Sequence, residues 1–499
     1  MALNQNLFAA LRAGFPANLD ATAIETCDTP ERLFYTWRDI DRASARIAVQ
    51  TEKSVEALLL YLAVLRAGFV YLPLNTAYQH GEIEYFIGNA EPSVVVCSPK
   101  NFPWVSTIAF KAGVQNVFTL GEDRSGSLVE RAAGHSDEHR PVHKSADELA
   151  AILYTSGTTG RSKGAMLSHG NLVSNARTLH DYWGWQASDV LIHALPIFHV
   201  HGLFVASHGA LLAGARMLWF NKFEPRATLA QLPRATVFMG VPTLYVRLLA
   251  EPALTREACA SMRVFIAGSA PLLAETFEAW RERTGHTIVE RYGMSETAML
   301  TSNPYHAKDG ERRAGTVGFA LPGVQVRVQD EKGQPCRSGE IGGIEVKGPN
   351  IFKGYWRMPE KTAEEFTTDL WFKTGDVGKI DERGVVTIVG RSKDLIISGG
   401  YNVYPAEIES LLNEQPGVLE SAVIGVPHPD FGEAVVAVLV PKAGLALDAA
   451  ALIAELKRRI ANFKVPKRVF IESELPRNQM GKVQKNLLRE RHKALFSNT

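Results

Sequence analysis

The sequence has few of the features that would mark an extracellular, fibrous or nucleic-acid-binding protein. Its 499 residues include only four cysteines, Cys27, Cys97, Cys259 and Cys336, which stand far apart without metal-site spacing. A chain of this length needs no disulfides to stabilise its core, so we expect a reducing, cytoplasmic environment. The net charge is only +1, which predicts no nucleic-acid partner and leaves anion binding to local clusters of charge.

Long apolar runs are also missing. The best candidate, residues 55–74, is interrupted by Glu56 and Arg66, so it falls short of the roughly 20 apolar residues that cross a bilayer. The N-terminal stretch MALNQNLFAALRAGF lacks the pattern of a secretory signal. We therefore expect no membrane partner, and we interpret residues 55–74 as a buried helix followed by a strand.

What the chain does have is an ordinary globular composition, 46% hydrophobic and 21% charged. Between about residues 50 and 300, short β-branched runs alternate with helical patterns, which predicts an α/β fold with parallel sheets covered by helices. Residues 314–390 read as closely spaced strands with glycine-containing turns, a β-rich subdomain. An α+β tail follows, so we predict two domains, residues 1–391 and 392–499.

A loop of small residues follows the apolar run at 149–154. In TSGTTGRSKG, residues 155–164, the glycines let backbone N–H groups approach an anion, and Arg161 and Lys163 add charge. Ser162 precedes Lys163 where the Walker pattern requires glycine, which argues against a kinase or GTPase loop. The loop predicts a polyphosphate cradle, whose candidate ATP contacts are Thr155, Ser156, Gly157, Thr158, Thr159, Gly160 and Lys163.

The longer motif YTSGTTGRSKGAMLSH resembles the phosphate-binding signature of the adenylate-forming superfamily, which includes acyl-CoA synthetases, adenylation domains and beetle luciferases. Other motifs of that superfamily follow in its order: PIFHVHGL, GSAPL, ERYGMSET, WFKTGD, GRSKDLIISGGYNVYPAEIE and LPRNQMGKVQKN. The resemblance implies a large N-terminal domain of stacked α/β subdomains plus a β-rich subdomain, with a small mobile C-terminal domain. It also implies formation of an acyl-AMP from ATP and then of a CoA thioester.

The resemblance assigns roles in the adenylation step. Lys482 matches the lysine that contacts the substrate carboxylate and the phosphate, and Glu296, with Thr155, would hold Mg²⁺. Asp376 would bind the ribose, with Arg391 as a second ribose or phosphate contact. The remaining nucleotide contacts would be Gly268, Ser269, Ala270, Pro271, Glu290, Arg291, Tyr292, Gly293, Met294 and Ser295, with Tyr292 stacked on adenine.

Two further roles concern the acid pocket and the second step. His199 and His201 lack the Cys, Asp or Glu partners of a metal site. The resemblance instead implies that His199 is a catalytic pocket-wall residue. For thioester formation, Lys393 matches the hinge between the domains. The turn Ser398, Gly399 and Gly400 would line the path of the pantetheine arm of coenzyme A.

The acid itself is predicted from two arginines in apolar surroundings, Arg247 and Arg291. A dicarboxylate leaves one carboxylate in the pocket after the other reacts, and that charge needs a bidentate cation. Each arginine has a plainer interpretation: an exposed helix face for Arg247, and an ion pair with Glu290 for Arg291. With the motifs above, however, the chain resembles bacterial malonyl-CoA synthetases.

We therefore predict that Arg247 and Arg291 hold the distal carboxylate of malonate, assisted by Ser269. Val200 and Met299 would limit the room at the α-carbon, which favours malonate over methylmalonate. The alternatives are a methylmalonyl-CoA synthetase, a medium-chain or aryl acyl-CoA synthetase, and a catalytically silent nucleotide-binding scaffold. We expect a monomer or weak dimer.

Overall fold

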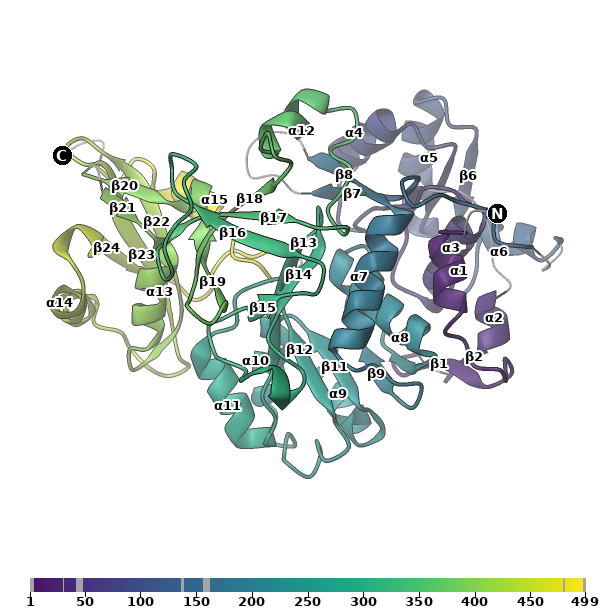
Figure 1. Cartoon of the computed structure of the whole chain (residues 1–499), viewed down its shortest axis with the longest axis horizontal. Helices are drawn as coiled ribbons and strands as arrows, with labels where there is room; N and C mark the ends of the chain where they lie inside the picture. Colours follow the sequence, from purple (N-terminus) through teal and green to yellow (C-terminus); the bar gives the residue numbers. More distant parts are fainter. Residues whose placement is uncertain are drawn as a thin grey trace.

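The structure of the chain, a computed structural model, describes residues 4–29, 31–41, 48–135, 139–155, 162–399, 401–478 and 481–496. It has the predicted α/β fold, with a large N-terminal part and a small C-terminal part at one end of the molecule (Figure 1). Within these ranges, none of the helices is both long and apolar enough to cross a membrane. The four cysteines are free thiols.

The largest sheet has nine strands in the order β15-β14-β13-β12-β11-β9-β10-β1-β2. The strands from β13 to β1 are parallel, and antiparallel pairs close both edges. Its strands are β1 (Thr22–Thr26), β2 (Phe34–Thr36), β9 (Val190–His193), β10 (Arg216–Trp219), β11 (Val237–Gly240), β12 (Val264–Ala267), β13 (Val289–Met294), β14 (Ala298–Ser302) and β15 (Phe319–Ala320). The helices of this region are α1 (Leu7–Arg12), α2 (Trp37–Asp41), α7 (His169–Tyr182), α8 (His208–Ala213), α9 (Pro225–Gln231), α10 (Pro242–Leu249) and α11 (Ala274–Thr284).

A second parallel sheet, in the order β4-β3-β5-β6, is formed earlier in the chain. Its elements are β3 (Ala48–Gln50), α3 (Val55–Arg66), β4 (Leu72–Pro73), α4 (His80–Ala90), β5 (Val94–Cys97), α5 (Phe102–Lys111), β6 (Asn116–Thr119) and α6 (Ser127–Ala132). The predicted buried helix and strand at 55–74 are confirmed as α3 and β4, because α3 is buried along nearly its whole length. The antiparallel hairpin β7 (Leu149–Thr155) and β8 (Lys163–Ser168) carries the predicted phosphate loop between its strands.

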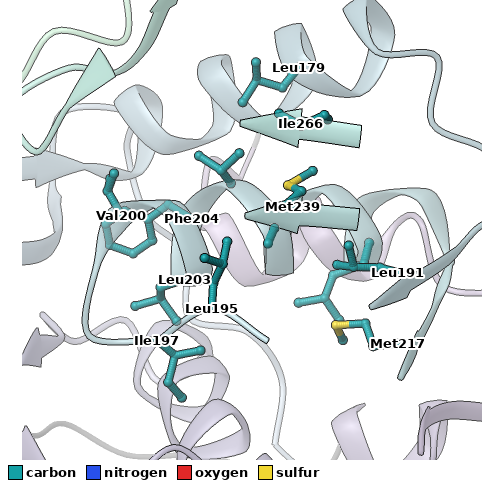
Figure 2. Close-up of a cluster of buried hydrophobic side chains, with 14 of the residues drawn as sticks. Leu179, Leu191, Leu195, Ile197, Val200, Leu203, Phe204, Met217, Met239 and Ile266 are labelled. Atoms are coloured by element: carbon teal, nitrogen blue, oxygen red, sulfur yellow. The ribbon is translucent and has the colours of Figure 1, made fainter. Parts of the chain in front are cut away.

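Buried aliphatic side chains hold the large sheet against its helices. Leu191, Met239 and Ile266 from neighbouring parallel strands lie in one cluster with Leu179 of α7 (Figure 2). Val200, from the predicted acid-pocket motif, belongs to the same cluster. The core of the sheet therefore extends up to the segment that follows β9.

The β-rich region is confirmed as a four-stranded antiparallel sheet of β16 (Gln325–Gln329), β17 (Gly342–Lys347), β18 (Phe372–Ile380) and β19 (Val386–Arg391), with α12 (Pro359–Glu365) beside it. The C-terminal part has its own sheet and cores: β20 (Ile396–Ser398), β21 (Tyr401–Val403), α13 (Pro405–Asn413), β22 (Val418–His428), β23 (Gly432–Pro441), α14 (Ala449–Arg459), β24 (Arg468–Ile471) and α15 (Lys485–His492). The strand β19 ends where we predict the domain boundary.

Polar contacts join the two parts in this arrangement. Lys442 pairs with Glu275 of α11 at 2.7 Å, and the side-chain amide of Asn402 donates to Glu331 at 3.0 Å. Both contacts are exposed, so each stabilises the docked arrangement only modestly. The mobility of the C-terminal part stays a prediction.

Candidate active site

The predicted motifs lie at the ends of neighbouring parallel strands. GSAPL follows β12, the segment with His199 follows β9, and ERYGMSET forms β13 and its turn into β14. Because the carboxyl ends of parallel strands share one edge of a sheet, these segments meet there. Ser269 has φ = 72°, a strained value for a residue other than glycine. Local strain of this kind is typical of functional loops.

Across the site, Tyr292 and Arg391 bind the two oxygens of one carboxylate. The Tyr292 hydroxyl donates to Oδ2 of Asp376, and Nε of Arg391 lies 2.6 Å from Oδ1 of Asp376. Asp376 and Arg391 are directly opposed on β18 and β19. The structure thus brings together three residues that the sequence assigns to the nucleotide; their contacts with adenine and ribose stay predictions.

The predicted magnesium ligand Glu296 lies in the turn between β13 and β14 and is buried. Its Oε1 accepts a hydrogen bond from Tyr355 at 3.0 Å, and the ammonium of Lys163 lies 4.2 Å from the centre of the Tyr355 ring. Burial raises the pKa of Glu296. A carboxylate that is ionised while buried needs a positive charge nearby. A hard cation such as Mg²⁺ would supply that charge to Glu296.

Some predicted nucleotide contacts cannot be placed. Ser156, Gly157, Thr158, Thr159 and Gly160 lie outside the described residues, as does Gly400. The flanking residues of the loop are described: Thr155 and Lys163 face each other across the hairpin, and Lys163 pairs with Glu365 at 3.2 Å. Gly293 and Met294 end β13, and Ser295 begins the turn that contains Glu296. Gly268, Ala270 and Pro271 are next to Ser269 in the chain, directly after β12.

Lys482 reaches this site from the C-terminal part. Its side chain is exposed, yet the surrounding protein removes enough water to lower the pKa of its ammonium, an effect that nearby Arg391 strengthens. Asp376 and Glu296 act in the opposite direction. The lysine predicted to be catalytic is therefore close enough to the nucleotide and acid residues to interact with both.

Arg291, predicted to bind the acid, is a buried cation. Only 2% of its surface is exposed, and its Nε and Nη2 have no hydrogen-bond partner in the described part of the chain. Burial lowers its pKa to about 9. A β-carbon at Gly268 would lie 2.6 Å from Cζ of Arg291, so the guanidinium occupies the space that only a glycine leaves.

The alternative that Arg291 pairs with Glu290 does not fit the strand geometry. Consecutive residues of a strand point to opposite faces, and the described residues include no ion pair between these two side chains. Oε1 of Glu290 instead accepts from the backbone N–H of Leu272 at 3.1 Å, while Oε2 is unpartnered. Burial raises the pKa of Glu290 to about 8. Glu290 therefore holds the GSAPL loop through the backbone of Leu272. The guanidinium of Arg291 remains available to a ligand.

Two histidines complete the acid side. Nδ1 of His201 lies 3.3 Å from Oγ of Ser269, and Nε2 of His201 is buried without a described partner. Burial, together with the charges of Lys482 and Arg291, lowers the pKa of His199 to about 3. Both rings are neutral at physiological pH, because burial and Arg291 also lower the pKa of His201. Neutral imidazoles can donate a hydrogen bond without adding further positive charge.

Arg247 has very different surroundings. It is exposed on α10 and lines a cavity of about 550 Å³ together with Thr243, Gly481 and residues 194–198. Arg291 does not line that cavity. The predicted clamp by both arginines thus stays a prediction. Val200 and Met299 are both fully buried, and their contact with the acid is likewise a prediction.

The predicted coenzyme A turn and hinge lie in the C-terminal part. Ser398 is buried at the end of β20, and Gly399 has φ = 58°, a conformation that favours glycine. Lys393 lies in the short 3₁₀ turn Ser392–Asp394, directly after β19. Burial and the neighbouring Arg391 lower the pKa of Lys393 to about 8.

The sequence did not identify three polar residues that the structure places here: Tyr355, His201 as the partner of Ser269, and Lys53. Tyr355 lies 59 positions from Glu296, outside every motif, so no local signal could have found it. Among the described residues, no group of three or more His, Cys, Asp or Glu side chains is arranged to bind a metal ion by itself.

Known proteins with the same architecture extend this picture. A crystal structure of ATP-bound MatB from Rhodopseudomonas palustris superposes with a TM-score of 0.95 and 55% identity, covering 99% of this chain and 100% of that one. The malonate–CoA ligase of Arabidopsis thaliana is 35% identical over 480 residues, 89% of this chain and 78% of the plant protein. A feruloyl-CoA synthase from an Amycolatopsis species is 36% identical over 434 residues, 85% of this chain and 84% of its own.

Two family descriptions match the two parts of the chain. Residues 40–356 match the AMP-binding enzyme family, and residues 407–482 match the AMP-binding enzyme C-terminal domain. The resemblance to the adenylate-forming superfamily is thereby confirmed. The chain belongs to the family of AMP-binding enzymes.

Proposed function

We propose that this protein is an acid–CoA ligase that converts malonate, ATP and coenzyme A to malonyl-CoA, AMP and diphosphate through malonyl-AMP. One observation carries the choice of acid: the guanidinium of Arg291 is buried, has two N–H-bearing nitrogens without a partner, and lies among Ser269, His201 and His199. Such a group is costly unless an anion binds it. The second carboxylate of a dicarboxylic acid is such an anion.

The first half-reaction brings three charged groups together. One carboxylate oxygen of malonate attacks the α-phosphorus of ATP, and diphosphate leaves. We propose that Lys482 bonds this carboxylate and the α-phosphate as negative charge develops there. His199 and Arg291 lie near enough to Lys482 to affect one another electrostatically, which supports an acid bound between them.

We assign Glu296 as the residue that holds Mg²⁺, with Thr155 beside it. The bound ion would offset the charge of the phosphates. Tyr355 orients Glu296 through its hydroxyl, and Tyr292 and Arg391 hold Asp376 for the ribose.

In the second half-reaction the coenzyme A thiol attacks the acyl carbon, and AMP leaves. We propose that the C-terminal part turns about Lys393 between the steps, which withdraws Lys482 and brings Ser398 and Gly399 to the thiol path. The predicted boundary between residues 391 and 392 belongs to the same proposal. The exposed contacts of Lys442 with Glu275 and of Asn402 with Glu331 support it, because each can be broken at low cost.

The relatives support malonate but also include other acids. The malonate–CoA ligase of Arabidopsis thaliana and the feruloyl-CoA synthase have nearly equal identity to this chain. Their acids differ in the group at the end away from the carboxylate that reacts: a second carboxylate in malonate, an aromatic ring in ferulate. The buried, unpartnered Arg291 favours the carboxylate.

The test is ATP–pyrophosphate exchange with malonate, methylmalonate, acetate, octanoate and ferulate as separate acids. We expect the largest kcat/KM with malonate, a smaller value with methylmalonate because of Val200 and Met299, and little exchange with the monocarboxylates. Strong exchange with octanoate or ferulate and none with malonate would refute the choice of acid. Absence of exchange with every acid would instead favour the silent nucleotide-binding alternative.

A further inference from the structure

A lysine outside every motif contacts the residue from which the segment with His199 and Val200 begins. Lys53 precedes α3, in the part of the chain that forms the smaller parallel sheet. Its Nζ donates to the carbonyl of His193 at 2.7 Å and to the carbonyl of Phe220 at 2.6 Å. Nζ also lies 3.0 Å from Nδ1 of His193 and 4.3 Å from the centre of the Trp219 ring. The ammonium therefore joins the carboxyl ends of β9 and β10.

The hydrogen bonds favour a protonated Lys53, whereas burial lowers the pKa of its ammonium. Nε2 of His193 lies 3.0 Å from the carbonyl of Gly202 and 3.0 Å from the hydroxyl of Ser207, which itself donates to that carbonyl, so Nε2 faces two acceptors and carries the proton. In the neutral ring Nδ1 is then an acceptor. Lys53 faces three acceptors, and only an ammonium has three hydrogens to donate.

Lys53 and His193 together hold both ends of the segment predicted to line the acid pocket, residues 194–201. The segment leaves the sheet at His193 and ends at Gly202, to which the His193 ring bonds. It folds back closely, since a β-carbon at Gly202 would lie 2.2 Å from the carbonyl oxygen of Pro196. His199 and Val200 lie within this segment. His201, at its end, contacts Ser269.

We infer that Lys53 is a positioning residue for the acid: through His193 it fixes the segment that carries His199 and Val200. This rests on the proposed function only in taking that segment as a wall of the acid pocket. Without the ammonium, two carbonyls and a ring nitrogen would lose their donor, and the segment would lose its shared anchor. Misplacement of reactive groups by about 1 Å costs roughly 100-fold in rate.

The cavity described above offers a specific test, because Lys53 and residues 194–198 both line it. Lys53→Ala removes three methylenes and the ammonium, which together correspond to propylammonium. We expect Lys53→Ala to lower kcat/KM for malonate in ATP–pyrophosphate exchange roughly 10- to 100-fold, with KM for ATP unchanged. Propylammonium should restore much of this loss, whereas tetramethylammonium, which has no N–H donor, should not.

The matched control is Lys222→Ala, which removes an exposed lysine from the same cavity. We expect it to leave malonate activation unchanged, with or without propylammonium. Lys53→Arg keeps the charge and should retain more activity than Lys53→Met; urea unfolding of each variant verifies that it is folded. Folded Lys53→Met with wild-type kcat/KM for malonate, or equal rescue by both ammonium ions, would overturn the inference.

The experiments on Lys53 and the test of the proposed function can fail independently of each other. The acid panel on the unchanged protein decides whether malonate is the substrate. If another acid is preferred, the Lys53 variants are measured with that acid, and the same loss and rescue are expected. An unchanged kcat/KM for the preferred acid would then refute the role of Lys53 alone.

Discussion

Arg291 and Arg247 are the same residue type, predicted for the same anion, in opposite environments. Arg291 is fully buried, packed against Gly268, and has unpartnered nitrogens. Arg247 is on the exposed side of α10, at the rim of the open cavity. An exposed guanidinium is satisfied by water at little cost, whereas a buried one needs a partner. The difference teaches that burial without a partner, more than charge alone, indicates a binding role.

The largest effect should come from Arg291→Gln. Loss of one partner of a buried charge pair costs about 2–5 kcal/mol, so kcat/KM for malonate should fall by roughly 30- to several thousand-fold. ATP–pyrophosphate exchange measures this, with KM for ATP as the internal control. Arg291→Lys should recover only part of the loss, since lysine cannot bond a carboxylate in a bidentate way. A malonate dependence that is unchanged in Arg291→Gln would exclude the buried arginine as the acid site.

The next effect concerns the free energy of unfolding. It tests whether Glu290 is protonated in the folded protein and so forms no ion pair with Arg291. The pKa of Glu290 is about 8 in the folded protein, above its ordinary 4.5. Between these values the folded state binds more protons than the unfolded state, so stability falls as pH rises. Glu290→Gln keeps an acceptor for the Leu272 N–H but cannot ionise, and should remove a loss on the order of 3 kcal/mol between pH 5 and 8. Urea unfolding at both pH values checks this; an equal pH dependence in both proteins would contradict it.

A smaller effect is expected for Ser269→Ala. The change removes the hydroxyl that contacts His201, at a cost of about 1 kcal/mol, or roughly fivefold in KM for malonate. Ser269→Gly is the matched variant, because it also removes the hydroxyl but relieves the strain of φ = 72°. Both should weaken malonate binding alike. Normal binding in the glycine variant would show that backbone geometry, rather than the hydroxyl, is what matters.

The smallest effect should come from Arg247→Ala. Because exposed charges contribute about 0–1 kcal/mol, we expect KM for malonate to rise less than about fivefold. The measurement is the same exchange assay, run beside Arg291→Gln. A loss as large as that of Arg291→Gln would support the two-armed clamp and remove the contrast between the arginines.

The sequence predicted the layers of this fold well, because periodicity and turn residues are local signals. It also placed Asp376 and Arg391 in one site through their motifs, and the structure pairs them directly. It could not predict that Glu290 bonds the Leu272 N–H while Nε and Nη2 of Arg291 have no partner among the described residues, since the phase of a strand depends on its neighbours. The role of Lys53 could not be predicted from the sequence for another reason: its partners His193 and Phe220 lie 140 and 167 positions away.

The acid-side residues Arg291, Ser269 and His201 come from the large sheet and its loops, whereas Lys482 arrives on a separate C-terminal part. Under the proposed function, choice of acid and delivery of the activating amine are encoded in different stretches of the gene. A hybrid that takes residues 392–499 from a relative with another acid should then keep the acid preference of this chain. Such a division would let evolution change the acid pocket without rebuilding the C-terminal part.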